Sequence, residues 1–203
     1  MGDNYALARE NARVYFLRQD HRKLAFKPGV SMVHGELLVP FLGEVYRVNL
    51  ETGRVYGKTE ANFEESLSVY DWLFHEGGAA SGEFCPVHAL PGVYVRGSGL
   101  QMSGGALPGL IDQNPRKFSE ICANLGGTPM PLGDMAYRLP VFPGLDMMLK
   151  FYHADEDFPP QLTCLWDRNV LQFLRYETVY YVAGCLFSKL RRGMTEHQAF
   201  FSN

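Results

Sequence analysis

Residues 135–169, MAYRLPVFPGLDMMLKFYHADEDFPPQLTCLWDRN, decide the fold. The segment contains three apolar runs, which we expect to form strands over residues 135–141, 145–153 and 162–166. The links between these runs are short and hairpin-like. Short links join antiparallel strands, because a parallel pair needs a crossover of about a dozen residues or more.

Strands cluster in the same way nearer the N-terminus, over residues 30–33, 36–41 and 44–50. The third of these alternates between two sets of side chains, the period of a half-buried strand, and His34-Gly35 suits a tight hairpin turn. Because strands come in clusters and not singly between helices, the sequence predicts an α+β fold with antiparallel or mixed sheets and about four flanking helices. The predicted helices cover residues 4–19, 63–76, 115–125 and 176–192.

The chain of 203 residues is long enough to bury a core of its own, and we expect a single domain over residues 1–203. Residues 97–114, GSGLQMSGGALPGLIDQN, are rich in glycine and predict a loop, a lid or a short irregular helix. They do not match the dinucleotide-binding pattern of glycines. If the chain has two subdomains, we expect them to divide at this glycine-rich segment.

Composition limits the classes of partner. The net charge of −3 and the isoelectric point near 6.1 supply no basic footprint, so we expect no nucleic-acid partner. We also expect no membrane partner and a cytoplasmic location, because no apolar run is long enough to span a bilayer and the first residues do not form a secretory signal. The cysteines are not clustered, which predicts reduced thiols and no iron–sulfur cluster; they are Cys85, Cys122, Cys164 and Cys185.

The acidic segment after residue 152 allows two interpretations. In an extended chain His153 and Asp155 point to the same side, so a carboxylate could orient the imidazole for proton transfer or hydrolysis. The alternative is a solvated turn between two strands, closed by the prolines that follow. The candidate catalytic residues are His153, Asp155, Glu156 and Asp157, with Glu83 or Asp134 assisting.

A metal site is a further hypothesis. Cys85 and His88 lie three residues apart, a spacing that a tight turn brings onto one ion, but zinc needs two more ligands. The spacing places none of the other candidates nearby; these are His34, His75, His153 and Cys164. The alternative is an edge segment with a buried thiol and a half-exposed imidazole.

A charged pair, Asp167-Arg168, ends the last predicted strand. We expect it to cap the following turn, or Arg168 to form an ion pair with Asp155 or Asp157. Either role is structural more often than functional.

Five segments, in order along nearly the whole chain, carry a family resemblance: LLVPFLGEVYRVN (37–49), SGEFCPVHALPG (81–92), NLGGTPMPLGDMAYRLPVFPGLDMML (124–149), ADEDFPPQLTCLWDRN (154–169) and FLRYETVYYVAGCL (173–186). On these residues the sequence resembles a bacterial and archaeal family of unknown function, DUF3786. The family's typical Trp-x-Gly-Asp-Glu-Glu-Phe-Pro-Pro run has Tyr152, Ala154 and Asp157 at three of its positions here. Some members carry an additional iron–sulfur domain, so the resemblance implies a connection with anaerobic redox or corrinoid-related metabolism, and no established activity.

Three functional hypotheses follow. The first is a non-catalytic accessory domain that binds an unknown small molecule or protein in a cleft bordered by residues 81–92, the glycine-rich segment and the acidic turn. Its candidate ligand-binding residues are Gly82, Glu83, His88, Asp134, Asp167 and Arg168. The second is the hydrolase or proton-transfer enzyme described above. The third is a self-associating structural protein, such as a homodimer, whose edge strand carries Pro86.

Overall fold

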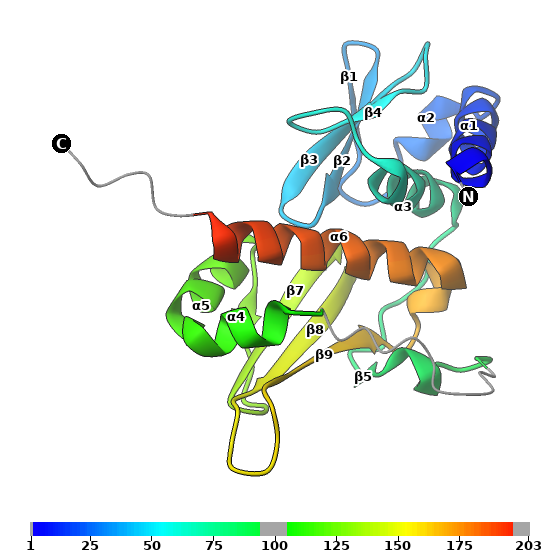
Figure 1. The fold of residues 1–203 in the computed structure, drawn as a ribbon. Coiled ribbons are helices and arrows are strands. Elements are labelled where there is room, and N and C mark those ends of the chain that lie inside the picture. Colours follow the sequence, from blue (N-terminus) through cyan, green and yellow to red (C-terminus); the bar gives the residue numbers. More distant parts are fainter. Residues whose placement is uncertain (1, 94–104, 197–203) are drawn as a thin grey trace.

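The computed structural model describes residues 2–93 and 105–196, and these form two antiparallel sheets with helices around and between them (Figure 1). Six α-helices occur in these ranges: α1 (Gly2–Leu17), α2 (His21–Leu24), α3 (Phe63–Phe74), α4 (Leu107–Gln113), α5 (Pro115–Asn124) and α6 (Tyr176–Thr195). Two 3₁₀ turns accompany them, η1 (Val87–Ala89) and η2 (Val170–Gln172). The α+β prediction is confirmed.

The first sheet is a four-stranded meander in the order β1-β2-β3-β4. Its strands are β1 (Ser31–Val33), β2 (Glu36–Phe41), β3 (Glu44–Asn49) and β4 (Val55–Tyr56). The turns His34-Gly35 and Leu42-Gly43 have positive φ at both positions, which matches the right-handed twist of a hairpin. Leu42 adopts this strained conformation at φ 46°, and its side chain is fully buried, so tertiary packing compensates the backbone strain.

The second sheet has the order β5-β9-β8-β7-β6, with every neighbouring pair antiparallel. Its strands are β5 (Phe84–Cys85), β6 (Thr128–Pro129), β7 (Met135–Phe142), β8 (Leu145–Tyr152) and β9 (Gln161–Asp167). The three long strands are those predicted, to within one residue at either end. The register of β8 on β9 is continuous from Met147 opposite Trp166 to Tyr152 opposite Gln161, whereas the pairing of β7 with β8 shifts between Pro140 and Phe142.

Helix α6 crosses between the two sheets, with α3 beside it, while α4 and α5 cover the same side of the second sheet (Figure 1). Helix α1 packs on α3 at the edge of the first sheet. Four of the helices correspond to the four predicted; α2 was not anticipated. Helix α4 occupies part of the glycine-rich segment, of which residues 97–104 lie outside the described ranges, so the division into subdomains stays a prediction.

Stacked aromatic rings join the two sheets. Phe41 of β2 stacks on Phe142 of β7 with ring centroids 4.6 Å apart, and Trp72 of α3 stacks on the same Phe142 at 4.7 Å. The backbone N–H of Leu42 donates to the carbonyl of Val141 at 3.0 Å, which links the two sheets directly. Such ring pairs contribute about 1 kcal/mol each beyond the area that they bury.

Candidate functional site

The acidic turn is a self-contained loop on the surface. The Asp155 carboxylate accepts hydrogen bonds from the backbone N–H groups of Asp157 at 2.9 Å and Phe158 at 2.7 Å. The N–H of Asp155 donates to the carbonyl of Phe158 at 3.0 Å, which closes the turn. Asp155, Glu156 and Asp157 are all exposed. The geometry is that of the solvated turn.

His153 pairs with a different carboxylate from the one expected. Its Nδ1 lies 2.7 Å from Oδ1 of Asp112 in α4, and its backbone N–H donates to Oδ2 of Asp134 at 2.8 Å. The structure thus brings together His153 and the predicted Asp134, and adds Asp112 (28% side-chain exposure) in place of Asp155. Asp112 was missed because it lies in the glycine-rich segment, where it is a single acid at the end of a short apolar run.

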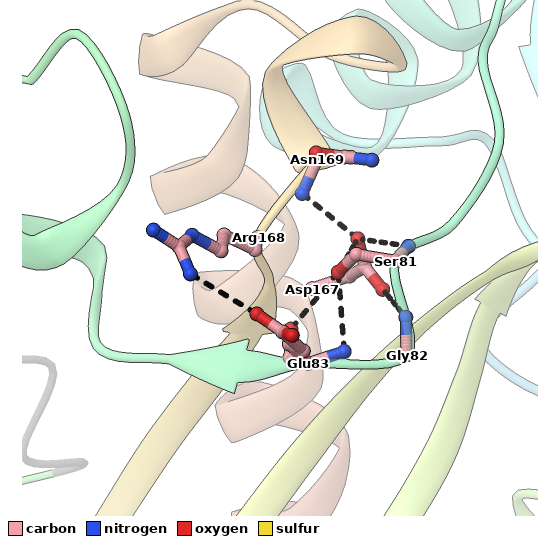
Figure 2. A network of polar contacts seen from close by, with 6 residues as sticks. All are labelled: Ser81, Gly82, Glu83, Asp167, Arg168 and Asn169. Carbon is pink, nitrogen blue, oxygen red and sulfur yellow. Dashed lines mark hydrogen bonds and ion pairs between the residues drawn. The ribbon is translucent and has the colours of Figure 1, made fainter.

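Asp167, at the end of β9, is the centre of a hydrogen-bond network (Figure 2). Its buried carboxylate accepts bonds from the backbone N–H groups of Ser81 at 3.0 Å, Gly82 at 2.8 Å and Asn169 at 2.8 Å, and from the Ser81 hydroxyl at 3.0 Å. Burial alone would raise the pKa of Asp167, but these hydrogen bonds stabilise the carboxylate, and on balance they lower that pKa. The network fastens the segment before β5 onto β9.

Arg168 pairs with Glu83, not with the acidic turn. Its Nη1 lies 3.0 Å from Oε2 of Glu83, and its backbone N–H donates to the Glu83 carbonyl at 2.8 Å (Figure 2). The prediction of a pair with Asp155 or Asp157 is therefore wrong. Because β5 pairs with the end of β9, Glu83, which directly precedes β5, lies beside Arg168. Four predicted ligand residues thus gather here, but they bond to one another; they are Gly82, Glu83, Asp167 and Arg168.

Cys85 and His88 do not form a metal centre with the other candidates. Cys85 is half-buried opposite Trp166 in the sheet, and burial raises the pKa of its thiol. His88 is exposed in η1. Within residues 2–93 and 105–196, no three side chains of His, Cys, Asp or Glu gather as a metal site. The other three thiols are buried and free, and burial raises the pKa of each; they are Cys122, Cys164 and Cys185.

A cleft that sequence reasoning did not predict lies between α1, α3 and the start of α6. Its volume is about 420 Å³. The lining residues are Ala8, Asn11, Ala12, Tyr15, Leu67, Tyr70, Asp71, Phe74, Arg175, Glu177, Thr178 and Tyr181. One wall is aromatic, since Tyr15 meets Phe74 edge to face at 4.7 Å and Tyr70 stacks on Phe74 at 5.9 Å.

The polar end of this cleft is organised by Asp71, which is 6% exposed. Its carboxylate accepts a hydrogen bond from the backbone N–H of Arg175 at 2.7 Å and lies 3.2 Å from Nε of the same arginine. His75 Nδ1 lies 3.4 Å from it on the other side. Burial raises the pKa of Asp71, but the bonds from His75 and Arg175 outweigh it and lower that pKa, while the bond to Asp71 raises the pKa of His75.

These observations define a class: an α+β domain of two antiparallel sheets joined through a helical layer, with a helix-lined cleft at one side. Within that class, the chain belongs to the family described as Domain of unknown function (DUF3786), whose model matches residues 20–189. The resemblance stated from the sequence is confirmed. Searches of curated proteins and of solved structures gave no significant match.

The matched residues include α3 and the start of α6 but not α1. Helix α1 therefore adds a wall to the cleft from outside the matched region. No described helix combines the length and the apolar character needed to cross a membrane.

Proposed function

We propose that this protein is a non-catalytic domain that binds a small ligand in the cleft between α1, α3 and α6. The observation that carries the proposal is the make-up of this cleft: about 420 Å³ with an aromatic wall and a few convergent polar groups. Ligand pockets typically measure roughly 300–1,000 Å³ and have this mixed lining. A drug-sized molecule with an apolar body and one polar end suits it.

The polar end of the cleft would orient a bound ligand. Asp71 holds Nε of Arg175, while the Arg175 side chain is 69% exposed, so the remainder of its guanidinium is open to a ligand. Glu177 and Tyr181 lie one helical turn apart on α6 and line the same space. A ligand donor or acceptor placed here would meet groups that the fold already holds in position, which reduces the entropy lost on binding.

A ligand screen by thermal shift tests the proposal. Amphipathic acids and amines of drug size are the first compounds of the panel, and the family resemblance adds corrinoids and tetrapyrroles. A bound ligand raises the melting temperature in proportion to the logarithm of its concentration above Kd.

Matched tryptophan variants locate the site. Ala8→Trp places an indole on the cleft lining, whereas Leu7→Trp, one position earlier on α1, replaces an exposed side chain that does not line the cleft. We expect ligand binding to be lost in the first variant and kept in the second. The proposal would be refuted if no compound of the panel raised the melting temperature, or if both variants bound the ligand equally well.

A second function, proton transfer or hydrolysis at His153, is favoured by the 2.7 Å contact between its Nδ1 and Asp112. A carboxylate on Nδ1 fixes the imidazole orientation and leaves Nε2 to exchange a proton with a substrate. Activated ester and phosphoester substrates test this idea with wild type, His153→Gln and Asp112→Asn. Equal turnover by all three proteins would exclude a role for the pair.

The third hypothesis, a self-associating structural protein, is tested by the mass in solution. Light scattering at several concentrations distinguishes the alternatives, and a monomeric mass throughout would remove it.

A further inference from the structure

A second hollow flanks α1 on the side away from the ligand cleft. Its volume is about 390 Å³, and it lies between α1, the β3–β4 hairpin and the start of α3. Its lining residues are Arg9, Glu10, Arg13, Thr52, Arg54, Val55, Glu60, Ala61, Ser66 and Tyr70. Three guanidinium groups thus meet in one hollow with only two carboxylates among its lining residues.

One of the three arginines has a structural task. Arg13 forms a two-pronged ion pair with Glu10, at 2.6 and 2.8 Å, and donates through Nη1 to the carbonyl of Thr52 at 2.6 Å. It clamps α1 to the hairpin turn, and its pairing neutralises the carboxylate of Glu10. These contacts give Arg13 a structural role, but they involve neither Arg9 nor Arg54.

The other two arginines are open to a ligand. Arg54 lies 3.5 Å from Glu60, and both side chains are about two-thirds exposed (67% and 63%), so solvent screens this pair and little stability follows from it. Within residues 2–93 and 105–196 Arg9 makes no direct hydrogen bond or ion pair, and its charge acts on Glu10 only at longer range, where it helps to lower the pKa of that carboxyl. Their cationic charge therefore remains available in the hollow.

The positive character continues beyond this hollow. A neighbouring depression of about 370 Å³ shares Thr52, Arg54, Val55 and Glu60 with it and adds Lys58. The Lys58 side chain is 86% exposed, and its Nζ lies 3.7 Å from Oε1 of Glu44, a pair that solvent screens. A chain with a net charge of −3 thus gathers four cationic side chains along one continuous trough. A local excess of this sign attracts anions and raises their local concentration.

We infer that this trough binds the phosphate group of a small molecule. Guanidinium groups form paired, charge-assisted hydrogen bonds to phosphate oxygens, with a geometry that an ammonium does not offer. The Arg9 and Arg54 side chains supply these donors, and Lys58 adds a point charge for a second phosphate. The inference is independent of the proposed function, because the two hollows lie on opposite sides of α1 and share only Tyr70 among their lining residues.

Titration of the full chain with inorganic phosphate and with pyrophosphate tests the inference, followed through the arginine Nε–H signals in NMR. We expect the signals of Arg9 and Arg54 to shift, with pyrophosphate the tighter ligand. Arg9→Gln and Arg54→Gln should each weaken pyrophosphate binding by about tenfold, the loss expected for one charge-assisted hydrogen bond. Arg116→Gln is the control, since this arginine is 91% exposed on α5, away from the trough.

Citrate and sulfate are the comparison anions. Weaker binding of both than of pyrophosphate supports a phosphate site. Citrate binding as tight as pyrophosphate overturns the assignment to phosphate. Unshifted signals at millimolar pyrophosphate, or equal affinities in wild type and both trough variants, overturn the site itself.

Discussion

Oδ2 of Asp167 accepts a hydrogen bond from the backbone N–H of Gly82 at 2.8 Å, across 85 positions of sequence. The same carboxylate binds the N–H groups of Ser81 and Asn169, so one side chain satisfies three backbone donors. A buried carboxylate is stable only when its oxygens are paired in this way. Asp167 is therefore the residue that fastens β5 to the edge of the second sheet.

Asp167→Ala should lower the free energy of unfolding by about 2–3 kcal/mol, because it leaves buried N–H donors without an acceptor. Urea denaturation followed by tryptophan fluorescence measures the change. Glu83→Gln is the matched control: it disrupts only the exposed pair with Arg168 and should cost less than about 0.5 kcal/mol. Equal losses in the two variants would contradict the assigned role of Asp167.

The pair of Asp71 and His75 should give a pH-dependent contribution to stability. The pKa of His75 is raised by Asp71, so the contribution is complete below the unfolded value near 6.5 and is lost as pH rises through the folded pKa. The pKa of Asp71 is lowered, so its contribution is present above about pH 4 and is lost as pH falls further.

The difference in unfolding free energy between wild type and His75→Gln isolates the histidine. We expect this difference to be largest between about pH 4 and pH 6.5 and to shrink above that window. A difference that stays constant from pH 5 to pH 9 would show that the pair does not titrate as a unit.

Lys27 should show the opposite dependence on pH. Its Nζ donates to the carbonyl of Trp72 at 2.5 Å and lies 4.3 Å from the centre of the indole ring. Burial lowers its pKa from 10.5 to about 8, against a smaller attraction from Asp71. Between these two values the unfolded chain binds more protons than the folded one, so stability rises with pH.

Lys27→Met removes this ionisation. The stability of wild type relative to Lys27→Met should therefore rise from about pH 8 to pH 10.5, measured by urea denaturation at fixed salt. Tyrosine and cysteine titrations occur in both proteins and cancel in the difference. A flat difference over this range would mean that the ammonium is solvated in the folded state.

Gly127 is required by close packing and not by its backbone angles. A Cβ at this position would lie 2.6 Å from both the Cys122 carbonyl oxygen and Cδ2 of Leu139. Gly127→Ala should destabilise the protein by about 1–3 kcal/mol through overpacking. Gly109→Ala in α4 is the control, since nothing lies within 4 Å of the added methyl group, and it should stabilise by about 0.5–1 kcal/mol. Thermal unfolding of both variants checks the signs.

Local patterns predicted most of the secondary structure. Asn62 and Glu65 form the reciprocal capping box that begins α3, and Pro115 begins α5. The His34-Gly35 turn fixes how β1 meets β2. Each of these features depends on residues only a few positions apart, so its physical cause is visible in the sequence. The family, too, was identified from short local motifs.

Which side chains meet at each candidate site was decided only by the tertiary structure. Asp112 reaches His153 across 41 positions, Asp167 reaches Gly82 across 85, and the cleft between α1, α3 and α6 needs three helices from separate parts of the chain. The error over Arg168 has the same origin, because sequence proximity favoured the acidic turn while the order of strands in the sheet presented Glu83. The sequence by itself determined periodicity, turns and caps, which are short-range; which side chains meet depends on how helices and sheets pack, and no local pattern contains that information.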